Sequence, residues 1–155
     1  YQGQIIATLP EKQGDLAFIK TNARRANYAF MQDDNLFVRQ KIFFPSFTNQ
    51  TGIFKKEESN ITFFGNKNHG LEISLPKDSE VIFGAPVFDN QGSLVALMAM
   101  NLNYNLEEKL VIATPISILK DLALRSGVPL YASNGSTPAK DFQKRAESLV
   151  KIICQ

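Results

Sequence analysis

The chain has few residues that could support chemistry by themselves. It contains one histidine, His69, and one cysteine, Cys154, which lie far apart in the sequence. A zinc site needs several nitrogen and sulfur ligands brought together, and these two residues cannot supply one. No glycine-rich phosphate loop precedes a helix either. We therefore expect no metal and no bound cofactor, and we expect His69, in the polar run 65–70, to be an exposed loop residue.

Charge and hydropathy exclude two classes of partner. Seventeen lysines and arginines stand against fifteen acidic residues, a net charge of +2, and basic residues cluster only at Arg24-Arg25 and Lys55-Lys56. Binding to nucleic acid needs a row of cations that neutralises phosphates, so no nucleic-acid partner is expected. No run approaches the ~18 consecutive apolar residues of a spanning helix, so no membrane insertion is expected.

Short segments with β-strand character dominate the first three quarters of the chain. They are rich in β-branched and aromatic residues and are bounded by Gly, Pro, Asn or Asp. These segments are residues 4–8, 16–20, 36–39, 41–44, 61–64, 71–75, 86–88, 93–100 and 110–113. Many short strands with frequent turns indicate a mostly β fold, either a closed or a sandwiched antiparallel one. A length of 155 residues suits one domain.

Two helices are predicted after the strands. Thr114 and Pro115 predict an N-cap and a first-turn proline for a helix over 114–127, which Gly127 ends. A linker over 128–136 leads to a second, amphipathic helix over 137–155.

The apolar face of that second helix comprises Phe142, Ala146, Leu149, Val150 and Ile153. Its polar side carries charges of both signs, which favours packing on its own domain over packing on a membrane. Cys154 is expected to be a small buried apolar group at its end, and as the single cysteine it cannot form an intrachain disulfide.

Four segments, which follow the same order along the chain as in the family, resemble trypsin-like (chymotrypsin-fold) serine proteases, especially the bacterial HtrA-like branch. GDLAFIK at 14–20 is similar to the strand that carries the catalytic aspartate, and YQGQIIATLP at 1–10 is similar to the strand before it. GAPVFDNQGSLVAL at 84–97 resembles the block that follows the catalytic serine. VIATPISILKDL at 111–122 resembles the strand and helix that end the protease domain. Together the likeness covers roughly residues 1–125.

The resemblance implies a trypsin-like double β-barrel whose N-terminal barrel is incomplete in this chain. Residues 1–127 would form the barrel domain, with 1–35 as a remnant of the first barrel and 36–113 as the second. Since HtrA-like proteins mostly work outside the cytoplasm, a periplasmic or secreted location is implied. Those proteins usually carry PDZ modules after this domain, whereas this chain has a linker and one helix.

The family performs nucleophilic acyl transfer with a serine, a histidine and an orienting aspartate. Asp15 takes the position of the aspartate. The family histidine lies upstream of that aspartate, whereas His69 lies well downstream of it, so the histidine is missing here.

Phe83 replaces the family serine. Aligning Pro86 with the family proline puts Gly84 and Ala85 on the two glycines and Phe83 on the nucleophile. Phenylalanine has no nucleophilic atom, and the branched residues before it, Val81 and Ile82, resist the tight turn that aims N–H groups at an oxyanion. A rival alignment makes Ser79 the nucleophile, but it leaves Glu80 where glycine belongs.

These residues favour a catalytically inactive homologue, a pseudoprotease that acts as a protein- or peptide-binding or scaffolding module. It could bind through the former active-site cleft or through the surface of its C-terminal helices. Phe83 would then fill the space that the nucleophile vacated. Two alternatives stay open: an active serine endopeptidase whose histidine lies outside this chain, and a structural β protein that shares only common hairpin features.

Overall fold

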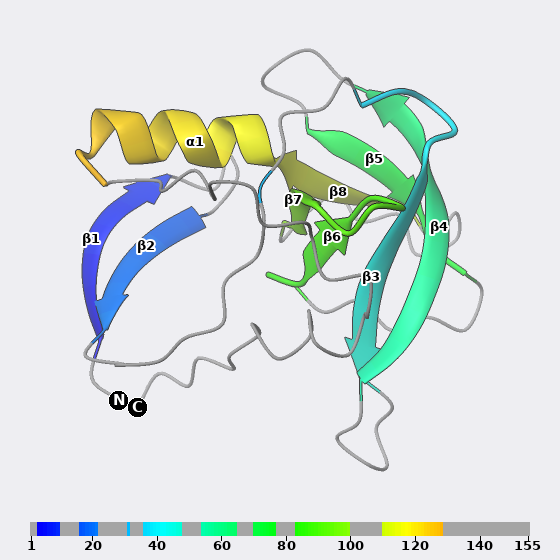
Figure 1. Cartoon of the computed structure of the whole chain (residues 1–155), viewed down its shortest axis with the longest axis horizontal. Helices are drawn as coiled ribbons and strands as arrows, with labels where there is room; N and C mark the ends of the chain where they lie inside the picture. The colour runs from blue at the N-terminus through cyan, green and yellow to red at the C-terminus, as the bar shows by residue number, and fades with distance from the viewer. Residues whose placement is uncertain are drawn as a thin grey trace.

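The computed structural model describes residues 3–9, 16–21, 31, 36–47, 54–64, 70–76, 83–99 and 110–128. Within them the chain is mostly β, as predicted (Figure 1). The elements are β1 Gly3–Leu9, β2 Leu16–Thr21, β3 Lys41–Phe47, β4 Phe54–Phe64, β5 Leu71–Ser74, β6 Pro86–Phe88, β7 Leu94–Met98, β8 Leu110–Pro115 and α1 Ile116–Arg125. No helix in this part of the chain is long and apolar enough to cross a membrane.

Six strands form a closed antiparallel barrel in the order β3-β4-β5-β8-β7-β6. The barrel closes where β3 pairs with β6, at Phe43 opposite Phe88. Closure gives each strand two neighbours, so no backbone edge of the sheet is left open. The closed β-barrel that the resemblance implies is therefore confirmed, and its six strands run from Lys41 to Pro115.

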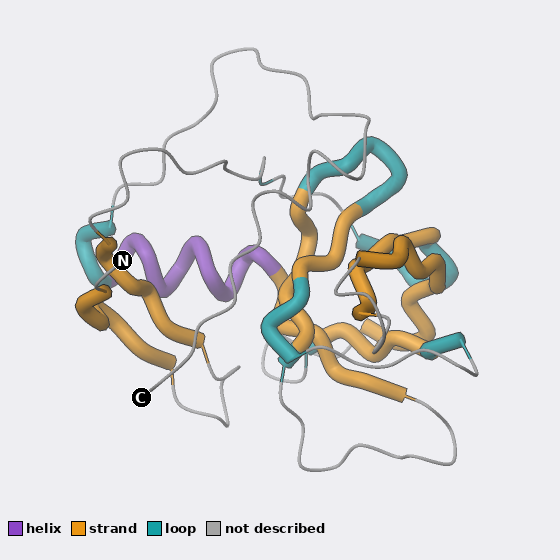
Figure 2. The backbone as a smooth tube through the Cα atoms, turned by 90° about the horizontal axis from the view of Figure 1, so that it is seen from below, coloured by secondary structure: helices purple, strands orange, loops and turns teal. Residues whose placement is uncertain are grey.

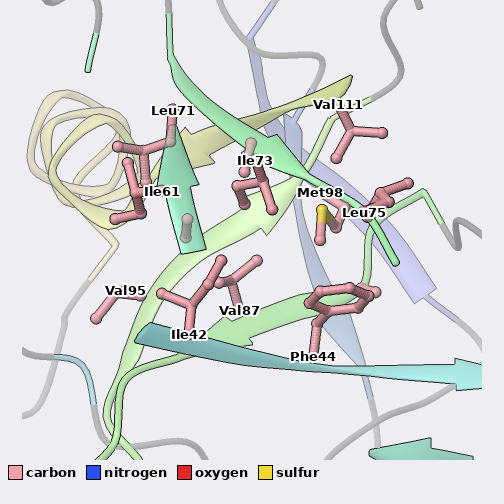
Figure 3. Close-up of a cluster of buried hydrophobic side chains, with 13 residues drawn as sticks. Ile42, Phe44, Ile61, Leu71, Ile73, Leu75, Val87, Val95, Met98 and Val111 are labelled. Carbon is pink, nitrogen blue, oxygen red and sulfur yellow. The ribbon is translucent and has the colours of Figure 1, made fainter. Parts of the chain in front are cut away.

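Among the described residues, the core of the barrel is mostly aliphatic, with Phe44 and Met98 as its larger members. Residues alternate between the two faces of a strand, and on β5 Leu71 and Ile73 point inward whereas Glu72 and Ser74 are half-buried. Figure 3 shows the inward side chains of several strands converging, with Phe44 beside Val87 and Met98. The buried members of this core are Ile42, Phe44, Ile61, Leu71, Ile73, Leu75, Ala85, Val87, Val95, Ala96, Met98, Val111 and Ala113.

The outer face of β6 and β7 is also covered, which explains their continuous apolar sequence. Phe88 and Leu94 form a second cluster with Ile116 at the start of α1. Met31, Leu97 and Leu119 pack against this cluster. α1 is thus held against the barrel by its first turns, and it extends from there toward β1 and β2 (Figure 2).

β1 and β2 form a separate two-stranded antiparallel sheet, here called the β1–β2 ribbon. A bulge between Ile5 and Ala7 leaves Ile6 without a register partner on β2. This ribbon precedes the barrel in the chain and is consistent with the incomplete first barrel that the resemblance implies.

Residues 36–39 are a turn, so the strand predicted there is wrong. The amide of Gln40 donates to the carbonyl of Phe37 at 3.0 Å, and Arg39 has a φ of 71°. The apolar triplet Leu36-Phe37-Val38 suggested a buried strand, but only Leu36 packs on the core, while Phe37 is 62% exposed. The turn is held by tertiary contact, because the amide of Arg39 donates to the carbonyl of Ile61 at 2.7 Å.

β4 begins at Phe54, well before the strand predicted at residue 61. The polar run KKEESN hid its first half, because charged residues are depleted in strands. Here the outward charges interact across strands. Lys41 forms an ion pair with Glu58, and Nζ of Lys56 lies 3.8 Å from the ring centre of Phe43.

The helix predicted over 114–127 is present but shorter. Pro115 is its N-cap residue, and no side chain caps the first turn, so the predicted cap by Thr114 is wrong. Thr114 instead lies in β8, opposite Leu97. Gly127 ends the helix as predicted: with a φ of 65° it turns the chain so that the amide of Val128 donates to the carbonyl of Ala123 at 2.9 Å. The linker after Val128 and the second predicted helix lie outside the described residues.

Replacing Ser59 with alanine is expected to lower the free energy of unfolding by about 0.5–1.5 kcal/mol. The buried Ser59 hydroxyl donates to the carbonyl of Ser74 and so joins β4 to β5. Thr62 makes the same kind of bond to the carbonyl of Glu72 at 3.1 Å, but in an exposed position. Urea titration should therefore show a smaller loss for Thr62→Val, and equal losses would contradict the role assigned to burial.

Candidate functional site

The turn that leads into β6 contains the residues aligned with the family nucleophile and the positions after it. Gly84 has a φ of 81°, a conformation that L side chains rarely adopt. Its amide donates to the carbonyl of Met98 at 2.7 Å, and the amide of Met98 donates to the carbonyl of Ala85 at 2.8 Å. These two bonds fasten the turn to the end of β7.

Phe83 is 48% exposed at this turn, so its ring does not belong to the buried core of the barrel. The core position at this end of the barrel is taken by Ala85, which is 5% exposed. Pro86 is buried and lies opposite Leu97. The aromatic ring therefore adds apolar surface to the outside of the molecule.

The space beside Gly84 is open. A Cβ atom built on this exposed glycine would meet no heavy atom within 4 Å outside its chain neighbours. The backbone next to Phe83 can thus be approached closely by another chain. A phenyl ring and an accessible glycine backbone side by side can offer apolar contact, whereas neither has an atom that could attack a carbonyl.

A buried carboxylate holds the hairpin between β6 and β7. Asp89 is 2% exposed, and its Oδ1 accepts hydrogen bonds from the amides of Gln91 at 2.9 Å and Ser93 at 2.8 Å. The amide of Gly92, which has a φ of 90°, donates to the carbonyl of Asp89 at 3.1 Å. The sequence DNQG predicts this reversal, and an aspartate before a turn glycine is the signal for such a bond.

The barrel also holds polar groups that the sequence reasoning missed. Glu57 is 8% exposed on the inward face of β4 and accepts a hydrogen bond from the Ser46 hydroxyl at 3.1 Å. Once β4 is known to begin at Phe54, strand alternation places Glu57, Ser59 and Ile61 on one face. The inward position of Glu57 was not predicted, because the charged run KKEESN is not typical of a strand.

Of the predicted site residues, Phe83, Gly84 and Ala85 lie in the segment that leads into β6, and Pro86 is the first residue of that strand. Asp15, which directly precedes the first residue of β2, lies outside the described residues, as do Ser79 and His69. Among the residues that the structure describes, no group of three or more His, Cys, Asp or Glu side chains could hold a metal.

The closed six-stranded barrel followed by a helix is a trypsin-like fold. A solved structure similar to this chain is that of Rv3671c from M. tuberculosis H37Rv, a trypsin-fold serine protease, in the inactive form of a serine-to-alanine mutant. The TM-score is 0.57, the sequence identity is 9%, and the match covers 84% of this chain and 68% of that one. At this identity the likeness shows the fold alone. No family model matches the chain, and no curated protein matches it.

Proposed function

We propose that this protein is a catalytically inactive trypsin-like serine protease homologue that binds a protein or peptide at the turn before β6. The observation that carries the proposal is Phe83, a half-exposed phenyl ring in the place aligned with the nucleophile. Acyl transfer needs a nucleophilic atom there, and this residue has none. The trypsin-like fold and the open approach to Gly84 support the proposal.

A fluorophosphonate probe and a peptide library test the loss of catalysis. We expect neither covalent labelling of the purified protein nor cleavage of any peptide. Hydrolysis that survives Phe83→Ala and disappears in Ser79→Ala would overturn the proposal, and it would establish instead the alternative, an active serine endopeptidase that uses Ser79.

Phe83→Ala is expected to weaken binding of a peptide selected from a library by roughly 10-fold or more, because partly exposed aromatic side chains are frequent anchors of interfaces. Phe37→Ala is the matched control, since Phe37 is a phenylalanine that is 62% exposed in the turn before β3. Titration calorimetry should show affinity lost only in Phe83→Ala. Equal affinities in both variants would place the binding surface elsewhere.

The same proposal includes a periplasmic or secreted location and the division into a barrel domain over 1–127, a linker over 128–136 and a helix over 137–155. The location is supported only by the HtrA-like resemblance. Cell fractionation checks the location.

Limited proteolysis checks the linker. Cleavage confined to 128–136 is expected, whereas equal cleavage throughout the barrel would contradict this division.

A further inference from the structure

The seam between β3 and β6, where the barrel closes, is held by one register pair. Phe43 lies opposite Phe88, and although both strands lie wholly within the described residues, no other pair of their residues is in register. Seven register pairs join β3 to β4, and three or four join each of the other neighbouring strands. Of the six seams of the barrel, this one therefore has the fewest backbone pairs.

Two prolines explain why the pairing stops there. Hydrogen bonds in an antiparallel ladder recur at every second residue of each strand. Pro45 lies two residues after Phe43 on β3, and Pro86 lies two residues before Phe88 on β6. The next pair of the ladder would set one proline opposite the other, and neither has an N–H group to donate.

Side chains close the seam beyond this point. Phe44, Pro45 and Ser46 of β3 are buried, and so are Pro86 and Val87 of β6. Figure 3 shows the ring of Phe44 beside Val87, so these two side chains meet across the seam. Apolar contact is non-directional and does not fix a register as a ladder of hydrogen bonds does.

The inside of the barrel next to this part of β3 is polar. The Ser46 hydroxyl donates to Oε1 of Glu57 at 3.1 Å, and the two residues are 3% and 8% exposed. Water that enters here restores hydration to a buried carboxyl group, which offsets part of the cost of opening. Opening between β5 and β8 would instead bring water to Leu71 and Ile73, both 0% exposed, with no such offset.

We infer that the β3–β6 seam is a gate through which the barrel opens locally and reversibly while its other five seams stay paired. β3 remains bound to β4 and β6 remains bound to β7, so two intact hairpins move apart. A local opening of this kind costs less free energy than global unfolding. The open gate gives water a route to the Ser46–Glu57 pair.

Thiol labelling of the full chain tests the gate with a matched pair of valines. Val87 lies on β6 at the seam and is 0% exposed, whereas Val111 lies on β8, opposite Ile73 of β5, and is 1% exposed. Each is replaced by cysteine in a Cys154→Ser background, because cysteine behaves as a small apolar residue when buried. Under native conditions the thiol of Val87→Cys should react roughly 10-fold faster or more than that of Val111→Cys.

The dependence of both labelling rates on urea separates local opening from differences in overall stability. Since local opening exposes little surface, the rate for Val87→Cys should rise less steeply with urea than the rate for Val111→Cys, which follows global unfolding. Equal rates with equal urea dependence would mean that both sites are reached only by global unfolding, and that result would overturn the inference.

Restoring the missing donors should close the gate. Pro45→Val and Pro86→Val together supply two N–H groups where the ladder stops, and they should slow labelling of Val87→Cys by roughly 10-fold or more. Pro115→Val is the matched control, because Pro115 lies on β8 opposite Ala96, at another seam. It should leave the labelling rate unchanged. Labelling that the double variant does not slow, or that Pro115→Val slows equally, would contradict a gate set by Pro45 and Pro86.

Discussion

Gly70→Ala should lower the free energy of unfolding by about 2–5 kcal/mol, the largest effect expected from a single added methyl group. A Cβ atom at Gly70 would lie 2.6 Å from Cγ2 of Ile112 and 2.9 Å from the carbonyl oxygen of Ala113. Its φ of 75° adds strain for any L side chain, about 1–2 kcal/mol. Part of the clash is with backbone of β8, which cannot move aside without opening its pairing with β5.

Gly84→Ala is the matched control for this prediction. Gly84 has a similar φ of 81°, but its Cβ position is open. Only the conformational strain should appear there, about 1–2 kcal/mol. Urea unfolding of the two variants separates strain from overlap, and a Gly84→Ala variant as unstable as Gly70→Ala would contradict the account of Gly70.

Asp89→Ala should lower the free energy of unfolding by about 2–4 kcal/mol, since two amides lose a charged acceptor in a buried place. The carboxylate is 2% exposed and accepts from both Gln91 and Ser93, so its loss affects both ends of the reversal. Because β6 carries the Phe83 turn at its start, the melting of this hairpin should also reduce peptide binding.

Asp89→Asn keeps one oxygen acceptor at the same place and should recover much of the lost stability. Asn90→Ala, at an exposed position of the same turn, should change stability by less than about 0.5 kcal/mol. Thermal unfolding of the three variants gives the comparison. If Asp89→Ala melted like Asn90→Ala, the hairpin would not depend on the carboxylate.

Gly70→Ala and Asp89→Ala are expected to act differently from Phe83→Ala at the proposed binding surface. Gly70 and Asp89 support the barrel, so their replacement should lower stability first and binding as a consequence. Phe83 is half-exposed, and Phe83→Ala should weaken binding with little change in unfolding. A variant set that loses stability and affinity in proportion everywhere would contradict a local binding role for Phe83.

Most strands could be predicted because their signals are local. Apolar residues, alternating in β5 and continuous in β6 and β7, mark these three strands within a few residues, together with the Gly, Pro, Asn and Asp residues between them. The two failures, at 36–39 and at 54–60, have one cause. Leu36-Phe37-Val38 looked apolar enough for a strand, and the run KKEESN looked too charged for one. Contacts with residues distant in sequence decided the structure of both segments. The carbonyl of Ile61 accepts a hydrogen bond from the turn, and β3 pairs along β4.

The amino-acid pattern was sufficient for the β class of the fold, the reversal at Asp89 and the phenylalanine in the aligned place of a nucleophile, since each depends on a few adjacent residues. Tertiary structure alone decided that the barrel closes between Phe43 and Phe88, that Gly70 presses against β8, and that Ala85 rather than Phe83 enters the core. Each of these depends on the packing of strands that are distant in sequence, and local propensity carries no information about which side chain such packing leaves at the surface.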